Sequence, residues 1–253
     1  MSEKQIVLVT GGTSGVGKAI AKSFAKRQAT VILVGRNAEK AQAAVAKLQQ
    51  DSGNQAISYL LGDLADKKQN QQIAAAFRNQ YDHLDVLVNS AGNIPQTAQN
   101  NIDLNLRSHY WLTHNLEPEL AKAQHAHVFI ITGMPLAIKV GPIYERQHSL
   151  LDRGLWLLTH KTLLVDLLAY QLAPHQISVN ALFPGGVQSN LLPWTKTITN
   201  TEVPAAVKIA TDPDLREISG SFFDDKAQVV PLNNCKYNVN RAKTALSPYL
   251  WTA

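Results

Sequence analysis

The sequence predicts an α/β protein in which a doubly wound parallel sheet of about seven strands carries helices on both faces. One observation behind this prediction is that short β-branched apolar runs alternate with stretches long enough for crossover helices. Another is that the apolar runs are unbroken, as in strands that are covered on both faces. The expected strands are residues 5–9, 30–34, 56–61, 84–88, 127–132, 177–183 and 227–230.

Two helical stretches lie between and after these strands. Asn37 can cap a helix whose Ala41, Ala44 and Leu48 share one face. The stretch 155–172 is more apolar than one buried face requires, which indicates either burial within the domain or a subunit contact in a homo-oligomer. The stretch 191–213 is rich in threonine and proline, and we expect a loop there that lies over a site.

Length and composition favour one globular domain over residues 1–253. Hydrophobic residues make up 45% of the chain and charged residues 17%, which is typical of a chain with a buried core and excludes a disordered one. The formal net charge of +5 comes without a run of lysine and arginine, so we expect no nucleic-acid partner.

The single cysteine, Cys235, excludes an internal disulfide and metal sites built on cysteine pairs. Such sparse use of cysteine fits a reducing compartment. The first residues show no signal-peptide core, and no apolar stretch is long enough to span a bilayer. We therefore expect a cytoplasmic protein with no metal and no membrane partner.

A glycine-rich turn, TGGTSGVG at residues 10–17, follows the first expected strand and opens a helix. Glycines in such a turn permit a tight bend, the close approach of a pyrophosphate and close helix packing, while the helix start offers free amides to phosphates. Because a second strand follows at the right distance, the turn predicts a Rossmann-type dinucleotide site. The turn residues expected to contact the cofactor are Gly11, Thr13, Ser14, Gly15, Val16 and Gly17.

The end of the second strand bears on which dinucleotide is bound. A free ribose 2′-hydroxyl is usually held by an acidic side chain at this place, whereas a 2′-phosphate needs a cation. Gly35 and Arg36 supply no acid and one cation, so the sequence favours NADP(H) over NAD(H). The alternative is that Arg36 is a solvated loop arginine.

These motifs, in this order, resemble those of the short-chain dehydrogenase/reductase family over nearly the whole chain, which implies a Rossmann fold. Gly62-Asp63-Leu64 is similar to the segment whose aspartate meets the adenine, and NSAG at 89–92 resembles the family's NNAG motif, with Ser90 as a departure. Residues 177–191 resemble the sixth strand and the turn that meets the nicotinamide, and 219–225 resemble the retinol-dehydrogenase-like branch. The further cofactor contacts that the resemblance implies are Asp63, Leu64, Asn89, Ala91, Gly92, Pro184, Gly185, Val187 and Ser189.

In this family a tyrosine transfers a proton, a lysine one helical turn later lowers its pKa, and a serine stabilises the oxyanion. Counting back from the helix end at Leu172 puts the tyrosine position at Gly154 and the lysine position at Leu158. The fifth strand puts the serine position at Gly133. Asn105 falls where the family keeps an asparagine that holds a water of its proton relay. The sequence therefore predicts a degenerate catalytic centre.

Other residues could replace the missing groups. Thr132 carries a hydroxyl beside the serine position, and Tyr144 precedes the helix. Lys161 has a long stem that could reach back, although a gap that moved it into register would rotate later residues off their face. His148 and His160 could titrate near neutrality. Each residue also has a purely structural interpretation, and the candidate catalytic residues are Asn105, Thr132 and Tyr144.

Two functions remain open at this point. The first is an oxidoreductase that uses NADP(H) to interconvert a small-molecule carbonyl and its alcohol. The second is a catalytically silent NADP(H)-binding sensor or partner subunit, for which the loss of tyrosine and lysine has no cost. Four apolar residues could either line a substrate pocket or pack in the core, namely Leu136, Ile138, Leu191 and Trp194.

Overall fold

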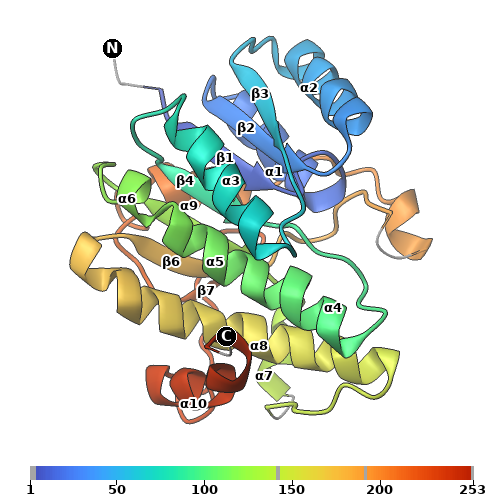
Figure 1. The fold of residues 1–253 in the computed structure, drawn as a ribbon, viewed down its shortest axis with the longest axis vertical. Coiled ribbons are helices and arrows are strands. Elements are labelled where there is room, and N and C mark those ends of the chain that lie inside the picture. Colours follow the sequence, from blue (N-terminus) through green and yellow to red (C-terminus); the bar gives the residue numbers. More distant parts are fainter. Residues whose placement is uncertain (1–3, 141–142, 191–192, 252–253) are drawn as a thin grey trace.

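The computed structural model describes residues 4–140, 143–190 and 193–251, in which seven parallel strands form one sheet with helices on both faces (Figure 1). The order across the sheet is β3-β2-β1-β4-β5-β6-β7. This arrangement confirms the predicted α/β class and the Rossmann-type fold. The strands are β1 (Ile6–Thr10), β2 (Thr30–Gly35), β3 (Ile57–Leu61), β4 (Val86–Asn89), β5 (His127–Ile131), β6 (Ser178–Leu182) and β7 (Phe222–Phe223).

The helices are α1 (Gly15–Ala25), α2 (Ala38–Ser52), α3 (Lys67–Arg78), α4 (Ala98–Ile102), α5 (Ser108–Asn115), α6 (Glu117–Leu120), α7 (Pro135–Val140), α8 (Leu150–Leu172), α9 (Pro204–Thr211) and α10 (Val239–Leu250).

Successive residues of a strand contribute to two separate cores, one on each face of the sheet. Val7 and Val9 of β1 pack on one face with α1, α2 and α9, whereas Leu8 packs on the other with α3, α5 and α8. This alternation explains why the strands are unbroken apolar runs.

The strand order reverses between β1 and β4, which are neighbours in the sheet although two strands separate them in sequence. Crossover helices therefore leave these strands toward opposite faces of the sheet, and a crevice opens beyond their carboxyl ends. The glycine-rich turn follows β1 and the NSAG segment follows β4. The topology thus brings both motifs to the place where doubly wound sheets bind ligands.

The seventh strand differs from the prediction. The strand expected at 227–230 forms only a bridge between Val229 and Phe223, and Ala227 has a φ of 60° that interrupts an extended chain. Phe222 and Phe223 pair instead with Ala181 and Leu182 of β6. Both phenylalanines are buried, so burial decided the pairing over the β-branched pattern.

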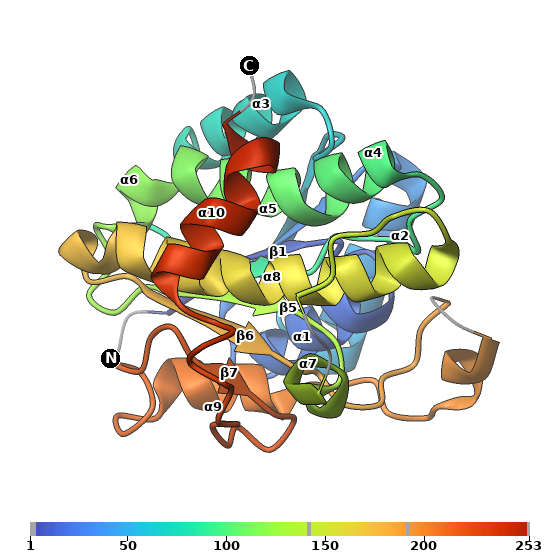
Figure 2. The ribbon, with the colours of Figure 1, turned by 90° about the horizontal axis from the view of Figure 1, so that it is seen from below.

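Helix α10 covers the apolar outer face of α8 (Figure 2). Leu164, Leu167 and Leu168 of α8 are fully buried within the chain, and the ring of Tyr249 packs edge-on against Trp156 at 5.0 Å between centroids. The face that suggested a subunit contact over 155–172 is therefore largely filled from within. The homo-oligomer stays a prediction that this helix no longer supports.

Two expectations about local structure had different outcomes. The side chain of Asn37 caps α2 by accepting the N–H of Lys40 at 2.9 Å, as expected. The predicted loop at 191–213 instead contains a 3₁₀ turn (Pro193–Thr197) and helix α9, whose buried alanines supplied too weak a pattern to predict it. No helix in the described ranges is both long enough and apolar enough to cross a membrane.

Candidate cofactor and active site

The turn between β1 and α1 adopts backbone conformations that favour glycine. Gly11 and Gly15 have φ values of 64° and 51°, in the left-handed region. A Cβ on Gly17 would lie 2.6 Å from the carbonyl oxygen of Gly11, so α1 packs on the turn because residue 17 has no side chain. Ser14 makes no capping hydrogen bond, and the first turn of α1 holds no acidic residue. The helix start is therefore suited to an anion.

Thr10 ties this turn to the loop after β4. Its hydroxyl donates to the carbonyl oxygen of Val88 at 3.1 Å and accepts the N–H groups of Ser90 and Ala91, both at 2.9 Å. A Cβ on Gly11 would lie 3.0 Å from the Cα of Ala91. The two motifs that the sequence placed after separate strands are thus in direct contact.

Three segments line a crevice of about 510 Å³ at this edge of the sheet. They are the glycine-rich turn, the loop at 90–96 and the segment after β6, which contributes Ser189 and Asn190. The turn and the last segment meet closely, because a Cβ on Gly15 would lie 3.1 Å from the Cβ of Ser189. The volume is in the range of small-molecule sites.

Arg36 lies in the connection between β2 and α2. Its side chain is 64% exposed, and its Nη1 lies 3.5 Å from Oδ2 of Asp63, which follows β3. The other oxygen of Asp63 accepts the N–H of Ala65 at 3.0 Å. Thr13 of the glycine-rich turn lies beside Gly35, whose Cβ would come within 2.7 Å of the threonine methyl group. An exposed pair such as Arg36 and Asp63 is weak, so the guanidinium can engage a stronger anion.

Other predicted contact residues lie next to the crevice but do not line it. Asn89 is fully buried, and its amide donates to Oγ1 of Thr113 at 3.1 Å. Gly185 has a φ of 75°, and a Cβ there would lie 2.7 Å from a carboxylate oxygen of Asp225. The buried residues among the predicted contacts that do not line the crevice are Leu64, Asn89, Ala91, Pro184 and Val187.

Lys161 is buried on α8, with 7% of its surface exposed. Its Nζ donates to the carbonyl oxygen of Ile131 at 3.2 Å, and a Cβ on Gly92 would lie 3.9 Å from that nitrogen. The ammonium group therefore lies between the ends of β4 and β5. Burial lowers the pKa of Lys161 from 10.5 to about 7.

Asn105 and His109 surround the same loop. Asn105 lies on a π-helical turn (Asp103–Arg107), where it accepts the N–H of Asn93 at 3.1 Å and donates to the carbonyl oxygen of Asn93 at 3.2 Å. The Nε2 of His109 is 2.8 Å from the carbonyl oxygen of Ala91. Burial and the charge of Lys161 lower the pKa of His109 well below its usual value, so it is neutral. Both side chains hold the loop in place.

The observation that decides the family comes from the sequence. Residues 5–137, more than half of the chain, match the family model described as short chain dehydrogenase. The chain belongs to the short-chain dehydrogenase family. The matched residues include the glycine-rich turn, Thr10 and the loop after β4, which are the parts that the structure brings together.

Curated relatives agree with this assignment. Human retinol dehydrogenase 11 is 30% identical over 201 residues, which are 74% of this chain and 63% of that protein. Human dehydrogenase/reductase SDR family member 12 is 36% identical over 136 residues, 51% of this chain and 43% of that protein. The chain thus spans less than two thirds of either relative. The first match confirms the resemblance to the retinol-dehydrogenase-like branch.

Solved structures share the fold. A short chain dehydrogenase from Shigella flexneri, complexed with NADP, has a TM-score of 0.74 and 23% identity, and the match covers 88% of this chain and 97% of that chain. One from Escherichia coli CFT073, complexed with NADPH, has a TM-score of 0.71 and 24% identity, over 88% and 96%. At such identities the likeness concerns the fold alone.

Helix α8 runs unbroken from Leu150 to Leu172, so counting back from Leu172 still assigns the family's tyrosine and lysine positions to Gly154 and Leu158. Leu158 packs on Gly133, where any Cβ would overlap its Cδ2, and Lys161, one turn beyond Leu158, reaches the end of β5 with its long stem, as expected. A Cβ on Gly154 would meet nothing within 4 Å, so that residue is outside any packed centre. Positions 158 and 161 lie on the same side of a helix, and periodicity alone could not distinguish them.

The structure does not bring Tyr144 to this centre. Its hydroxyl donates to Oδ1 of Asp152 at 2.8 Å, and that hydrogen bond raises the pKa of Tyr144. Asp152 belongs to the first turn of α8, about 13 Å from Lys161 along the helix axis. His148 is exposed, and His160 stacks on Trp156, where burial lowers its pKa to about 4.

Thr132 remains a candidate. It is 9% exposed, and its hydroxyl has no hydrogen-bond partner among the described residues. A buried hydroxyl without a partner is costly unless a ligand or water completes it. Thr132 stands in the chain between Ile131, whose carbonyl oxygen accepts the hydrogen bond of Lys161, and Gly133, against which Leu158 packs.

Sequence reasoning missed some supporting residues and misjudged two apolar ones. Thr10 belongs to the recognised motif, so its role could have been found there, whereas His109 carried no sequence signal. Leu136 and Trp194 are 66% and 60% exposed, so core packing was the wrong interpretation for both. Ile138 is buried, and Leu191 lies outside the described residues.

Proposed function

We propose that this short-chain dehydrogenase is an NADP(H)-dependent oxidoreductase that acts on a small-molecule carbonyl or alcohol, in the cytoplasm. The observation that carries the proposal is the crevice in which the glycine-rich turn, the loop after β4 and the segment after β6 meet. The buried ammonium group of Lys161 lies beside Gly92, which lines that crevice. Structures of the same fold that were solved with NADP and NADPH support the choice of cofactor.

The residues present fit a dinucleotide phosphate. The open start of α1 suits the pyrophosphate, and Arg36 suits the 2′-phosphate. Glycine at 11, 15 and 17 leaves space that a Cβ would fill. When bound, the nicotinamide supplies or accepts the hydride.

Lys161 can supply the amine that is missing at Leu158, and a tyrosine one helical turn before Lys161 would then stand at Leu157. A group with a pKa of about 7 can release and regain a proton at neutral pH, which suits Lys161 to general acid and base work. The free hydroxyl of Thr132 can hydrogen-bond a substrate oxygen. Asn105 positions the loop at Asn93.

One observation favours the second candidate, a catalytically silent sensor or partner subunit that binds NADP(H). Leu158 fills the space beside Gly133 and Leu157 precedes Lys161 by one turn, so the places of the serine and the tyrosine are apolar. Stable association with a related active subunit would identify the partner-subunit form.

Oxidation of NADPH in the presence of aldehydes and ketones distinguishes the two functions. We expect sustained, carbonyl-dependent oxidation that Asn105→Ala and Thr132→Val abolish, because the first loosens the crevice wall and the second removes the free hydroxyl. Thr244→Val, at an exposed position of α10, is the matched control and should leave the rate unchanged. Absence of oxidation with every carbonyl would support the silent module.

Replacing Arg36 tests the cofactor preference. Arg36→Gln should weaken NADPH binding by roughly tenfold to a hundredfold, because it removes a charge-assisted bond of about 1.5–3 kcal/mol. NADH affinity should change little, since that cofactor has no 2′-phosphate. Fluorescence titration of both cofactors measures the effect, and equal losses for both would contradict the assignment of Arg36.

A further inference from the structure

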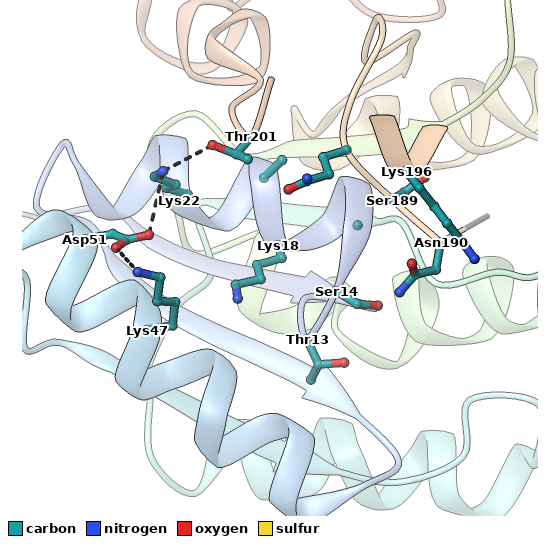
Figure 3. A pocket seen from close by; sticks show the side chains of 13 residues that line it. Thr13, Ser14, Lys18, Lys22, Lys47, Asp51, Ser189, Asn190, Lys196 and Thr201 are labelled. Atoms are coloured by element: carbon teal, nitrogen blue, oxygen red, sulfur yellow. Dashed lines mark hydrogen bonds and ion pairs between the residues drawn. The ribbon is translucent and has the colours of Figure 1, made fainter. Parts of the chain in front are cut away.

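A second cavity, of about 430 Å³, lies on the other side of the glycine-rich turn from the crevice. Lys18 and Lys22 of α1, Lys47 and Asp51 of α2, and Lys196 of the segment after β6 line it, and we call it the lysine pocket. Figure 3 shows Lys18 in the space between α1 and α2, with Lys22 and Lys47 on the Asp51 side and Lys196 opposite.

The lysine pocket holds more positive than negative charge. Asp51 is the one acidic residue among the described residues that line it, and it pairs with Lys47 at 2.8 Å and with Lys22 at 3.7 Å. Lys22 is also 3.6 Å from Glu202, outside the pocket. Lys18 and Lys196 have no ion pair among the described residues. The lining of the pocket thus holds four lysines and one carboxylate, and Glu202 outside the pocket pairs with one of these lysines.

This excess of positive charge destabilises the folded chain when no anion is bound. Lys18 and Lys22 lie one turn apart on α1, where like charges repel. Burial lowers the pKa of Lys18 against the opposing effect of Asp51, and the charges of Lys47 and Lys22 add to the lowering. An anion in the pocket would relieve this repulsion. Hydroxyl groups of Thr13, Ser14 and Thr201 complete a lining suited to oxyanions.

The chemistry of the lining selects the ligand class. A monocarboxylate carries one charge for the two ammonium groups that have no ion pair among the described residues, Lys18 and Lys196, whereas a phosphorylated molecule carries two or more charges and several acceptor oxygens. Lysine binds phosphate groups well as a point charge. A pocket of this volume suits a small metabolite and not an extended polymer.

The lysine pocket is separate from the cofactor crevice, although the two are neighbours. They share Ser14, Gly15, Ser189 and Asn190 as a common wall, but none of the four lysines lines the crevice and Arg36 does not line the pocket. We propose that the lysine pocket binds a small phosphorylated molecule other than the nicotinamide cofactor, held by Lys18, Lys22, Lys47 and Lys196.

Calorimetric titration with inorganic pyrophosphate, at fixed ionic strength and with NADPH at saturation, tests the proposal. The wild type should show saturable binding. The double variant Lys18→Gln and Lys47→Gln should bind at least tenfold more weakly, because it loses two charge-assisted contacts. The control Lys67→Gln and Lys68→Gln removes the same charge from the exposed start of α3 and should bind like the wild type.

Titration of the wild type with and without NADPH separates this proposal from the cofactor assignment. Saturating NADPH should leave the binding of pyrophosphate to the lysine pocket in place, and the Lys18→Gln and Lys47→Gln variant should keep its preference for NADPH over NADH. Undetectable binding of millimolar pyrophosphate to the wild type, or equal affinity in the wild type and the lysine variant, would overturn the lysine pocket. Loss of pyrophosphate binding on addition of NADPH would do the same, since the anion would then use the cofactor site.

Discussion

Lys161→Met is expected to stabilise the folded chain at neutral pH while it impairs turnover. The unbranched methionine fills the space of the lysine stem and removes a buried charge that lowers the pKa of Lys161 from 10.5 to about 7. A shift of this size corresponds to a gain on the order of 4 kcal/mol in the free energy of unfolding. Retaining so costly a residue is typical of a functional site.

The pH dependence has a defined sign. Between pH values of about 7 and 10.5 the unfolded chain binds a proton at Lys161 that the folded chain does not. The free energy of unfolding of the wild type should therefore rise with pH across this window, and the full penalty should be present below about pH 7. Lys161→Met should lack this rise.

Urea unfolding at several pH values measures both effects. Lys208→Met, on the exposed side of α9, is the matched control and should preserve the pH dependence of the wild type. If Lys161→Met shows the same rise as the wild type, Lys161 is not a buried amine with a lowered pKa, and its proposed proton transfer fails with it.

Leu157→Tyr is expected to raise carbonyl-dependent NADPH oxidation by roughly a hundredfold or more, the usual effect of a positioned proton donor. Leu157 is half-buried and stands one helical turn before Lys161. A phenol there would share a face with the ammonium group, whose charge would favour the phenolate.

Two further variants isolate the cause of any gain. Leu157→Phe adds the ring without the hydroxyl and should leave the rate unchanged. Gly154→Tyr puts the same phenol at the position first counted from the helix end, where it would face open space, and should also have no effect. Equal rates for the tyrosine and phenylalanine variants at 157 would contradict the proposal that Lys161 supplies the missing amine.

The sequence predicted the parts of the molecule that depend on local pattern. Unbroken apolar strands and a glycine-rich turn after the first strand led to the correct class and to the correct edge of the sheet. The structure was needed to show that the stem of Lys161 reaches the end of β5, because Leu158 and Lys161 occupy the same side of the helix. It was also needed to show that Tyr144 is bound by Asp152 and not free to act.

Charge clusters that form only in the folded chain could not be predicted from the sequence, for a different reason. Lys18, Lys47 and Lys196 are far apart in the chain, and no local run of lysine marks them. They line one pocket because α1 and α2 pack side by side and the segment after β6 folds back onto the glycine-rich turn. Only the topology makes one pocket of three separate elements.

The affinity of the purified wild-type chain for NADPH and for NADH, measured by energy transfer from protein to nicotinamide fluorescence, tests the proposed function most directly. NADPH should bind at least about tenfold more tightly, since Arg36 adds a charge-assisted contact that only the 2′-phosphate can use. Failure of both cofactors to bind would show that the glycine-rich turn serves only the fold, and equal affinities would contradict the choice of NADP(H).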